Sequence, residues 1–385
     1  MRHISILGST GSVGTQALDV IAANPERFCV DGLAAYHNDE LLEKQMRLFQ
    51  PAQAVLVDKA AAERLRKRYQ GTTEILDGED ALLTVATLPA TETVLTAMVG
   101  FVGLKPTLAA IDAGKTIALA NKETLVAAGE IVMQRAREKQ VKILPVDSEH
   151  SAIYQALNGE SRQSVSRLIL TASGGPFRGF NRQQLASVTI ADCLRHPNWS
   201  MGKKITVDSA TLVNKGLEVI EAHWLFDVDY DSIVVSVHPQ SIVHSMVEYI
   251  DGSVIAQLGQ PDMRVPIQYA FSYPERLRST FPRLDFHAMK DLTFAAPDMD
   301  TFPSLRMAVE AGRTGGTLPC VFNAANEEAV AAFLTGNIGF LAIYQVIEQV
   351  MASHQIMSSP VLEEIFAAND WARAQARKII DGMAG

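Results

Sequence analysis

The sequence predicts an α/β protein with a parallel sheet at its N-terminus, an α+β part with a mixed sheet in its middle and a helical bundle at its C-terminus. Three observations predict this fold. Apolar strands alternate with amphipathic helices over the first part of the chain, as in doubly wound sheets. Three strand-like runs follow one another between residues 233 and 258. From Phe302 onward the apolar periodicity is helical, which indicates a small bundle.

The length of the chain, 385 residues, exceeds one ordinary hydrophobic core, so we expect several domains. The predicted N-terminal domain covers residues 1–147. A middle domain with the candidate catalytic residues covers 148–275. A linker over 276–300 is rich in Pro, Phe and short breaks, and a helical domain covers 301–385.

Composition narrows the classes of function. The formal net charge of -9 argues against a nucleic-acid partner, which needs a basic face. No apolar run approaches the length of a membrane span. Cys29, Cys193 and Cys320 are far apart and show neither a zinc spacing nor a disulfide framework, which fits a reducing cytosol. We therefore expect a cytoplasmic protein without a nucleic-acid or membrane partner.

The first element is a strand over Ile4–Leu7, followed by the turn Gly8–Gly14 and a helix that ends near Ile21. This order opens a Rossmann-like dinucleotide-binding unit, in which backbone N–H groups and the helix N-terminus hold a pyrophosphate. The spacing is G-x-x-G-x-x-G, whereas the standard motif is G-x-G-x-x-G. The alternative is an ordinary strand-to-helix turn, but the position directly after the first strand favours a nucleotide.

The second strand runs from Cys29 to Ala35 and is followed by His37 and Asn38. An NAD enzyme usually has a carboxylate at this strand end, where it binds the ribose 2′-OH. Here Asp39 and Glu40 lie further along, and His37 and Asn38 occupy the expected ribose position. The missing carboxylate favours NADP, and the alternative for His37 is an exposed loop residue.

Further strands and helices continue the parallel sheet. The expected strands are Ala54–Val57, Thr93–Val99, Thr116–Leu119 and Lys142–Leu144, and the expected helices are Ala60–Tyr69, Gly103–Ala113 and a long helix that ends near Lys139. Asn121, Lys122 and Glu123 lie at the carboxyl end of a strand, where ligands bind in such sheets. A lysine there is able to hydrogen-bond a substrate hydroxyl. The alternative is the usual polar start of a helix.

Two carboxylates, Asp147 and Glu149, follow the last strand of the N-terminal sheet. On an extended backbone, residues two apart point to the same side. The two carboxylates are then able to converge on one hard cation such as Mg²⁺ or Mn²⁺. The alternative is a solvated acidic turn, and only other parts of the chain decide between the two.

The chain after His150 changes its pattern. Residues 151–157 have the pattern of a helical turn, and a strand over Ser166–Ala172 leads into Ser173, which precedes two glycines and is able to offer its hydroxyl and nearby N–H groups to an anion. Residues 195–204 contain Trp199 and Met201 without periodicity, as in a loop that folds over a ligand and excludes water. The alternatives are a tight turn and a surface loop whose Trp packs on its own domain.

The stretch from Asp208 to Ala222 is a predicted helix with Asp208 or Ser209 as its N-cap. Its apolar face is marked by Leu217, Ile220 and Trp224. Another face holds Asn214, Glu218 and Glu221, with Lys215 beside Glu218. Ser209, Asn214 and Lys215 are candidates for a phosphate site, and Glu218 for completing the metal site of Asp147 and Glu149. The alternative is a surface helix with internal ion pairs.

The remaining elements complete the middle sheet and the bundle. We expect strands over Ile233–Val237, Ile242–Tyr249 and Ser253–Leu258, and a helix after Arg264. We expect C-terminal helices over Ser304–Ala311, Val321–Phe333, Leu341–Met351 and Val361–Ile380.

Several short stretches together carry a resemblance across nearly the whole chain. They are Gly8–Gly14, Ala120–Glu123, Pro145–His150, Ser173–Phe177, His196–Gly202, Val207–Thr211 with Asn214–Glu218, His238–Ser241, and Asn323–Glu327 with Leu318. With these stretches the sequence resembles the 1-deoxy-D-xylulose 5-phosphate reductoisomerases of the non-mevalonate isoprenoid pathway. Each piece alone is unspecific, and the combination is specific.

The resemblance implies an enzyme that uses NADPH and a divalent cation, Mn²⁺ or Mg²⁺, to rearrange and reduce 1-deoxy-D-xylulose 5-phosphate, a sugar phosphate, to 2-C-methyl-D-erythritol 4-phosphate. It also implies a homodimer. The metal ligands would be Asp147, Glu149 and Glu218. The catalytic residues would be Lys122, Glu149, Glu218 and His196.

The resemblance further implies two sets of ligand contacts. The substrate contacts would be Lys122, Ser148, Glu149, Ser173, His196, Trp199, Met201, Ser209, Asn214, Lys215, Glu218 and Met263. The cofactor contacts would be Gly8, Thr10, Gly11, Ser12, Val13, His37, Asn38, Asn121, Glu123 and Gly202.

The chain departs from the family at the end of the second strand. Family members often carry Gly-Lys-Asn where this chain has Tyr36-His37-Asn38. Histidine is a weaker and pH-dependent cation for a 2′-phosphate. Two rival readings are a plain NADP-dependent dehydrogenase, whose product keeps a linear carbon skeleton, and a nucleotide-binding regulator without turnover.

Overall fold

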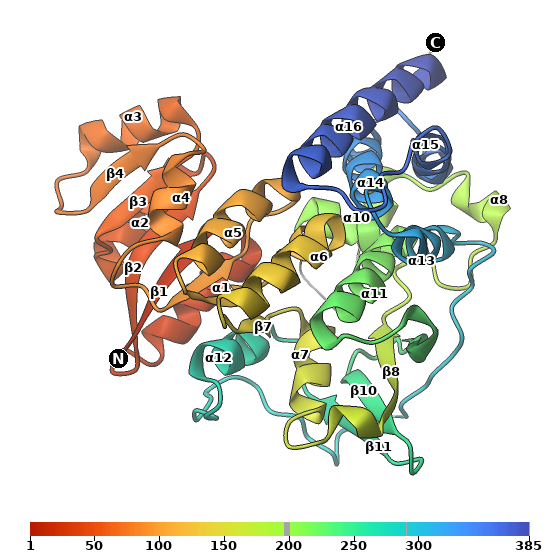
Figure 1. The fold of residues 1–385 in the computed structure, drawn as a ribbon, viewed down its shortest axis with the longest axis horizontal. Coiled ribbons are helices and arrows are strands. Elements are labelled where there is room, and N and C mark those ends of the chain that lie inside the picture. Colours follow the sequence, from red (N-terminus) through yellow and green to blue (C-terminus); the bar gives the residue numbers. More distant parts are fainter. Residues whose placement is uncertain (196–200, 290, 385) are drawn as a thin grey trace. The chain divides into compact units, whose positions relative to one another are not determined.

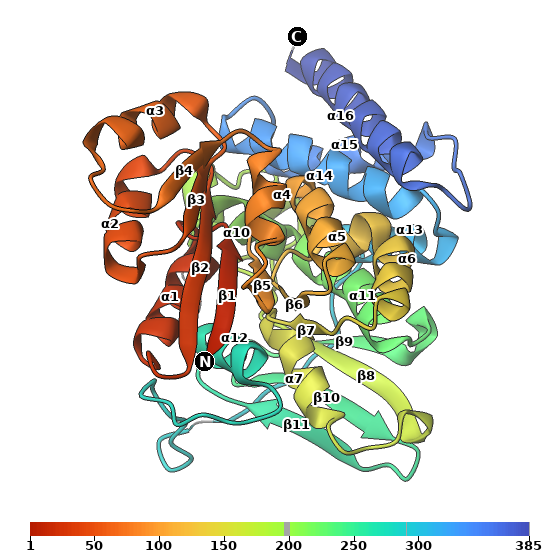
Figure 2. The ribbon, with the colours of Figure 1, turned by 60° about the vertical axis from the view of Figure 1, so that its left-hand side comes forward.

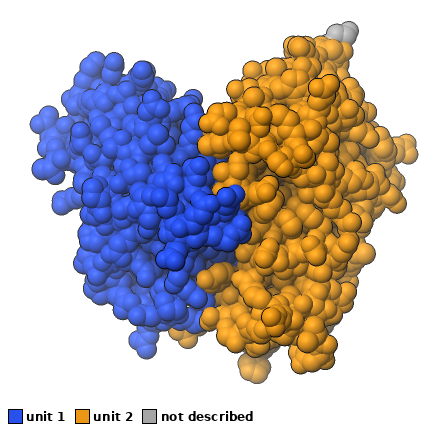
Figure 3. All heavy atoms as spheres, in the orientation of Figure 1, with its two compact units in different colours: residues 1–124, 132–151, 262–282 blue, residues 125–131, 152–261, 283–385 orange. Residues whose placement is uncertain are grey.

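The computed structural model describes residues 1–195, 201–289 and 291–384, and the chain divides into two compact units (Figures 1 and 3). Unit 1 comprises residues 1–124, 132–151 and 262–282. Unit 2 comprises residues 125–131, 152–261 and 283–385. The boundaries between these units differ from the predicted domain boundaries. In particular, residues 262–282 belong to the N-terminal unit.

Unit 1 is built on a seven-stranded sheet with the order β4-β3-β2-β1-β5-β6-β7 (Figure 2). All neighbouring pairs are parallel. The strands are β1 Arg2–Leu7, β2 Phe28–Ala35, β3 Gln53–Leu56, β4 Glu74–Asp77, β5 Thr93–Thr96, β6 Thr116–Leu119 and β7 Ile143–Pro145. The strand order reverses direction between β1 and β5, which is the place where open α/β sheets bind ligands.

The helices of unit 1 cover the sheet. They are α1 Ser12–Ala22, α2 Asp39–Phe49, α3 Lys59–Arg68, α4 Ala81–Ala86, α5 Leu104–Asp112 and α12 Arg264–Ser272. Two further helices, α6 Glu123–Glu138 and α7 Ser148–Ala156, have residues in both units. Helix α12 packs on α1, and α4 packs on α5. The central strands are buried on both faces, which explains their continuous apolar runs.

Unit 2 contains a mixed four-stranded sheet with the order β11-β10-β8-β9. The strands are β8 Val165–Ala172, β9 Ile233–Val237, β10 Val243–Tyr249 and β11 Val254–Leu258. Strands β8 and β9 are parallel, and β10 is antiparallel to both of its neighbours. The predicted mixed sheet is therefore confirmed.

The helices of unit 2 share one hydrophobic core with this sheet. They are α8 Arg182–Leu185, α9 Ile190–Cys193, α10 Lys203–Thr211, α11 Val213–Phe226, α13 Ser304–Thr314, α14 Leu318–Leu334, α15 Phe340–Ala352 and α16 Leu362–Ala384. Phe340 links the layers, since its ring centroid lies 5.2 Å from that of Phe177 and 5.9 Å from that of Phe333. The four predicted C-terminal helices are confirmed with shifted ends.

Some expectations about individual elements are wrong. Helix α7 begins at Ser148, so Glu149 lies in the first turn of a helix and not on extended backbone. Asp208 and Ser209 lie inside α10, and the next helix begins only after Leu212, which has a φ of 62°. The elements α2, β4 and α4 were not predicted. Strand β4 and helix α4 are short, with four and six residues, whereas α2 is amphipathic with Leu42 and Met46 on its buried face, so its period was overlooked.

Among the described residues we find no helix with the length and apolar character that a membrane crossing requires.

Candidate active site

The glycine turn of unit 1 brings the backbone close to itself at two positions. Gly8 has a φ of 95°, and a Cβ there would lie 2.5 Å from the carbonyl oxygen of Ala97. A Cβ on Gly14 would lie 2.2 Å from the Gly8 carbonyl oxygen. Only glycine fits at both positions, which explains the spacing of the motif without a ligand. Backbone packing in the turn therefore accounts for glycine at positions 8 and 14.

The residues between these glycines are the ones that a ligand can reach. Gly11 and Ser12 are exposed, and Thr10 and Val13 are half-buried. Gly11 is the N-cap of α1 and supplies no side chain, and the first turn contains no acidic residue. The positive end of α1 is therefore open to an anion such as a pyrophosphate. This is the cradle that a dinucleotide needs.

Sequence reasoning missed the loop that follows β5. The Ala97 N–H donates to the Leu7 carbonyl, so this loop lies beside the glycine turn at the reversal of strand order. Val99 in this loop is 70% exposed, and Gly100 has a φ of 81°. No signal for this loop was available in the sequence, because residues 97–99 are apolar and continue the strand pattern, which in the structure ends at Thr96.

The end of β2 holds the candidate ribose residues. His37 is exposed, and the Asn38 side chain accepts a hydrogen bond from the Leu41 N–H as the N-cap of α2. Asp39 is ion-paired with Arg64 and Arg68, and the hydrogen bond from Arg64 is the main cause that lowers the pKa of the Asp39 carboxyl. The charge of Asp39, the first carboxylate in the chain after His37 and Asn38, is thus compensated by two guanidinium groups.

The residues after β6 form a buried polar network. The Asn121 amide donates to the carbonyl groups of Met98 and Gly100 and to the Glu123 carboxylate. Its oxygen accepts from the Thr124 hydroxyl. Asn121 and Glu123 are nearly fully buried, so this network holds the loop after β5 against the start of α6. The structure therefore gives Asn121 and Glu123 a positioning role.

Lys122 and Asp147 form a buried ion pair in unit 1. Their side chains are 7% and 10% exposed. Burial by itself would raise the pKa of Asp147, but the Lys122 ammonium and His150 hold the pKa of that carboxyl well below its usual range. Asp147 is therefore an anion at any physiological pH, as a metal ligand must be. Next to it, the Ser148 hydroxyl donates to the Glu149 carboxylate at 2.6 Å.

Helix α11 of unit 2 carries the second group of candidates. Glu218 is 1% exposed, forms an ion pair with Lys215 and accepts a hydrogen bond from the Asn214 amide at 2.5 Å. Lys215 is 4% exposed, so the pair lies away from bulk water. Leu217 and Ile220 are buried, as predicted for the apolar face. A surface helix, the alternative interpretation, is excluded because Glu218 and Lys215 are buried.

The turn after β8 places Ser173 near α10 within unit 2. Gly174 and Gly175 have φ values of 81° and 67°, and the Gly175 N–H donates to the Ser173 hydroxyl at 3.2 Å. A Cβ on Gly175 would lie 2.8 Å from the Ser209 carbonyl oxygen. The backbone of Ser209 therefore touches this turn, and the predicted phosphate residues of the two stretches lie in one region.

The loop before α10 is only partly described. His196 and Trp199 lie outside the described residues. Met201 is half-buried, and Gly202 is the N-cap of α10, where no other described part of the chain comes within 4 Å of a Cβ position. Met263 belongs to unit 1 as the N-cap of α12 and is half-buried.

The residues fit the groups that the motifs imply. Asp147, Glu149 and Glu218 offer only carboxylate oxygens, which are the ligands of Mg²⁺ and Mn²⁺. The glycine turn places the exposed residues Gly11 and Ser12 at a helix N-terminus, which suits a pyrophosphate. Lys215 and Asn214 add a cation and an amide donor for a phosphate.

Family models match most of the chain. A model described as 1-deoxy-D-xylulose 5-phosphate reductoisomerase matches residues 4–129. A model of the C-terminal domain of 1-deoxy-D-xylulose 5-phosphate reductoisomerase matches residues 143–226, and a further model, DXP reductoisomerase C-terminal domain, matches residues 258–375.

Individual proteins match over their full length. The chain is 53% identical over 385 residues to 1-deoxy-D-xylulose 5-phosphate reductoisomerase of Gloeobacter violaceus, covering 99% of this chain and 98% of the relative. It is 55% identical over 383 residues to the protein of the same name from Desulforamulus reducens, covering 99% of both.

Solved structures agree with these matches. The Zymomonas mobilis reductoisomerase in complex with NADPH has a TM-score of 0.92 and 43% identity, covering 98% of this chain and 99% of that one. A DOX-P reductoisomerase in complex with NADPH, fosmidomycin and magnesium has a TM-score of 0.93 and 39% identity, covering 99% and 98%.

Proposed function

The chain belongs to the 1-deoxy-D-xylulose 5-phosphate reductoisomerase family, and from this premise we propose that it converts 1-deoxy-D-xylulose 5-phosphate to 2-C-methyl-D-erythritol 4-phosphate. It uses NADPH and a divalent cation, and the reaction is a step of isoprenoid precursor biosynthesis. The observation that carries the proposal is the identity above 50% to named relatives over nearly the whole chain.

The two cofactors supply the reactive chemistry. When bound, NADPH supplies a hydride and the divalent cation acts as a Lewis acid on a carbonyl oxygen. Every other requirement falls to the side chains and backbone of this chain: they bind the phosphate, orient the hydroxyl groups and exclude water.

The NADPH site lies at the carboxyl edge of unit 1. The pyrophosphate binds the N–H groups around Gly11 and Ser12, and Gly8, Thr10, Val13, His37, Asn38, Asn121, Glu123 and Gly202 complete the site. This assignment is supported by the open N-terminus of α1 and by the compensated charge of Asp39 at the ribose end. With that carboxylate paired to two arginines, repulsion of a 2′-phosphate is reduced.

The cation is held by Asp147, Glu149 and Glu218. Support comes from the burial of Glu218, from the low pKa of Asp147 and from the purely oxygen donor set. Lys122, which pairs with Asp147, and Ser148, whose hydroxyl donates to Glu149, bind substrate hydroxyl groups. Lys122, Glu149, Glu218 and His196 form the catalytic group.

The substrate phosphate is bound by residues of unit 2. They are Ser173, His196, Ser209, Asn214 and Lys215. Support comes from the contact between the Ser173 turn and α10 and from the buried ammonium of Lys215. Phosphate contacts far from the reacting carbons supply binding energy that positions those carbons. We also assign Trp199, Met201 and Met263 to the substrate contacts.

The test is NADPH oxidation, followed by absorbance, with 1-deoxy-D-xylulose 5-phosphate and Mn²⁺, repeated after EDTA and again after the metal is restored. We expect oxidation that stops with chelation and returns with metal, and a branched product by mass spectrometry and NMR. Oxidation that is indifferent to EDTA, with a linear product, would contradict the proposal and indicate a plain dehydrogenase. Binding of NADPH without any turnover would also contradict it.

We place the enzyme in the cytoplasm as a homodimer. The location is supported by the three cysteines, which are free thiols. The dimer is supported by β11, which ends the mixed sheet and exposes Val254 and Ile255 by 48% and 39%. An exposed apolar edge strand is suited to pairing with a second copy. The opposite edge, β9, is bridged to residue Ala295.

A further inference from the structure

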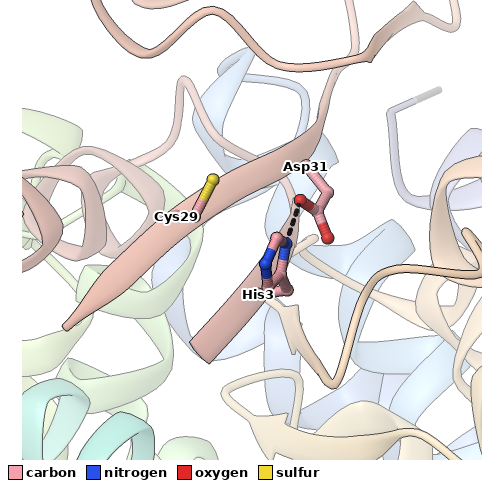
Figure 4. Close-up of side chains that lie close together, drawn as sticks. All are labelled: His3, Cys29 and Asp31. Carbon is pink, nitrogen blue, oxygen red and sulfur yellow. Dashed lines mark hydrogen bonds and ion pairs between the residues drawn. The ribbon is translucent and has the colours of Figure 1, made fainter. Parts of the chain in front are cut away.

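Three side chains of different chemistry meet at the amino-terminal ends of β1 and β2 (Figure 4). A nitrogen of His3, the sulfur of Cys29 and a carboxylate oxygen of Asp31 lie within 4.8 Å of one another. The Nδ1 atom of His3 and Oδ1 of Asp31 are 2.7 Å apart. The glycine turn follows the opposite, carboxyl end of β1, so the proposed reaction does not use this cluster.

The pairing of the two strands builds the cluster. His3 and Cys29 are partners in the parallel ladder, so their side chains start from neighbouring backbone positions. The register then shifts, because Ile4 pairs with Val30 but Ser5 pairs with Gly32. Asp31 is therefore the extra residue of a β-bulge, which commonly re-aims a side chain. In Figure 4 the Asp31 carboxylate points toward the His3 ring.

The carboxylate of Asp31 is also held by a hydrogen bond to its second oxygen, Oδ2. The Thr91 hydroxyl donates to its Oδ2 at 2.9 Å, and the Ser5 and Thr91 hydroxyl oxygens are 2.8 Å apart. Carboxylates that bind metals are themselves hydrogen-bonded in this way. Asp31 is 8% exposed, whereas the His3 side chain is 37% exposed and Cys29 is half-buried. The group is thus fixed on one side and accessible from the solvent on the other.

We propose that His3, Cys29 and Asp31 bind a borderline-soft divalent cation of the zinc type, with water as the fourth ligand. Imidazole, thiolate and carboxylate are all ligands of Zn²⁺, at about 2.0–2.3 Å. Tetrahedral geometry at those lengths separates ligand atoms by about 3.3–3.8 Å. The observed 2.7 Å between Nδ1 of His3 and Oδ1 of Asp31 is shorter than this range, and all three ligand atoms lie within 4.8 Å of one another. Small side-chain rotations therefore bring the three atoms to the ion.

Binding includes one proton transfer. The Cys29 thiol has a pKa raised by burial and by the charge of Asp31, so without an ion it keeps its proton. The metal–sulfur bond forms as the S–H bond breaks, and the proton leaves to water. The bound ion joins β1 to β2 at the start of the sheet. A plain His3–Asp31 ion pair, the other interpretation of this cluster, gives Cys29 no role.

Cobalt(II) distinguishes this site from the carboxylate site of the proposed reaction. A Co²⁺–thiolate bond gives a charge-transfer absorption band, which carboxylate ligands cannot produce. The experiment titrates Co²⁺ into the full chain with Mg²⁺ in excess, and repeats it with C29S, H3Q and C193S. We expect a band that saturates at one Co²⁺ per chain in the wild type and in C193S. We expect its loss in C29S and at least about tenfold weaker Co²⁺ binding in H3Q.

Two results would overturn the proposal. One is a wild-type protein that binds NADPH but shows no thiolate band. The other is a band that persists in C29S. Cys29 and serine are nearly the same size, and His3 is partly exposed, so H3Q decides the outcome should C29S fail to fold. The band does not depend on turnover, so its outcome is independent of the proposed reaction.

Discussion

Each buried lysine of the candidate site is paired with a carboxylate that we assign to the cation. Lys122 holds Asp147, and Lys215 holds Glu218. Buried charges without partners are costly, and each lysine gives its carboxylate a charged partner inside the protein. The lysines therefore offset the cost of burying these two carboxylates inside the protein.

Replacing Glu218 by Gln removes one anionic ligand and the partner of Lys215. We expect turnover with Mn²⁺ to fall more than about a hundredfold, because loss of even an outer partner of a metal ligand costs 10- to 100-fold. The measurement is kcat and the Mn²⁺ affinity from metal-dependent NADPH oxidation. Glu248→Gln, which breaks a surface ion pair with Arg167, is the control and should behave as the wild type. Unchanged Mn²⁺ affinity in Glu218→Gln would refute its role as a ligand.

His244 on β10 makes stability depend on pH. Burial is the main cause that lowers its pKa from 6.5 to about 4. Between these values the unfolded chain binds more protons, so the free energy of unfolding falls as the pH falls. The contribution of His244 is about 2 kcal/mol smaller at pH 5 than at pH 7.

Urea unfolding at pH 5 and pH 7 measures this difference. His244→Gln should show a smaller loss of stability on acidification, by about 2 kcal/mol. His287→Gln, which changes an exposed histidine, should keep the wild-type difference. An equal loss in His244→Gln and in the wild type would show that other groups cause the pH dependence.

At the scale of elements, α11 is positioned by its contact with α13. Gly216 is the fourth residue of α11, and a Cβ there would lie 2.5 Å from Cβ of Ala308 and 3.5 Å from the Ser304 carbonyl oxygen. The glycine weakens the helix but lets α13 approach closely. This contact fixes the helix that carries Glu218.

Gly216→Ala should therefore destabilise the protein by about 1–3 kcal/mol through overpacking, despite the better helix propensity of alanine. Gly382→Ala is the matched control, because its Cβ position in α16 has no neighbour within 4 Å among the described residues, apart from its chain neighbours and the backbone of its own helix. We expect that variant to be neutral or slightly more stable, by up to about 1 kcal/mol. Equal effects in urea unfolding would show that propensity, and not the contact with α13, governs Gly216.

Two family stretches have structural explanations at the same scale. The Asn326 amide donates to Asp208 at 2.9 Å and joins α14 to α10, while Glu327 pairs with Arg373 of α16. The His238 ring accepts from the N–H groups of Ile242 and Val243 through Nε2, so its Nδ1–H donates to the Thr293 carbonyl at 2.9 Å. These residues hold elements in place and do not need a ligand to account for them.

At the scale of the whole molecule, the exposed edge of β11 predicts a dimer that one charge can disrupt. Ile255→Glu should give monomers, because a charge on an edge strand opposes pairing. Light scattering with size-exclusion chromatography measures the mass. Val234→Glu, on the edge strand that is bridged at Val237, is the control and should stay dimeric. Dimers in both variants would place the interface elsewhere.

The sequence by itself determined most of the elements and the types of ligand group in the molecule. The parallel unit, the mixed sheet and the helical bundle follow from local apolar periods, which burial on one or both faces of an element imposes. The candidate ligand types also follow, because a cation needs oxygen ligands and a pyrophosphate needs free N–H groups. The pairing of Lys215 with Glu218 was predictable, since residues three apart meet on one helix face.

Only the tertiary structure decided the features that depend on residues far apart in the sequence. Glu149 lies on a helix and not on a strand, and Lys122 meets Asp147 although 24 intervening residues separate them. The cluster of His3, Cys29 and Asp31 does not follow the spacing of a metal-binding sequence motif, because strand register and a β-bulge bring the three residues together. Local patterns encode which face of an element is buried, whereas packing selects the partner that lies against it.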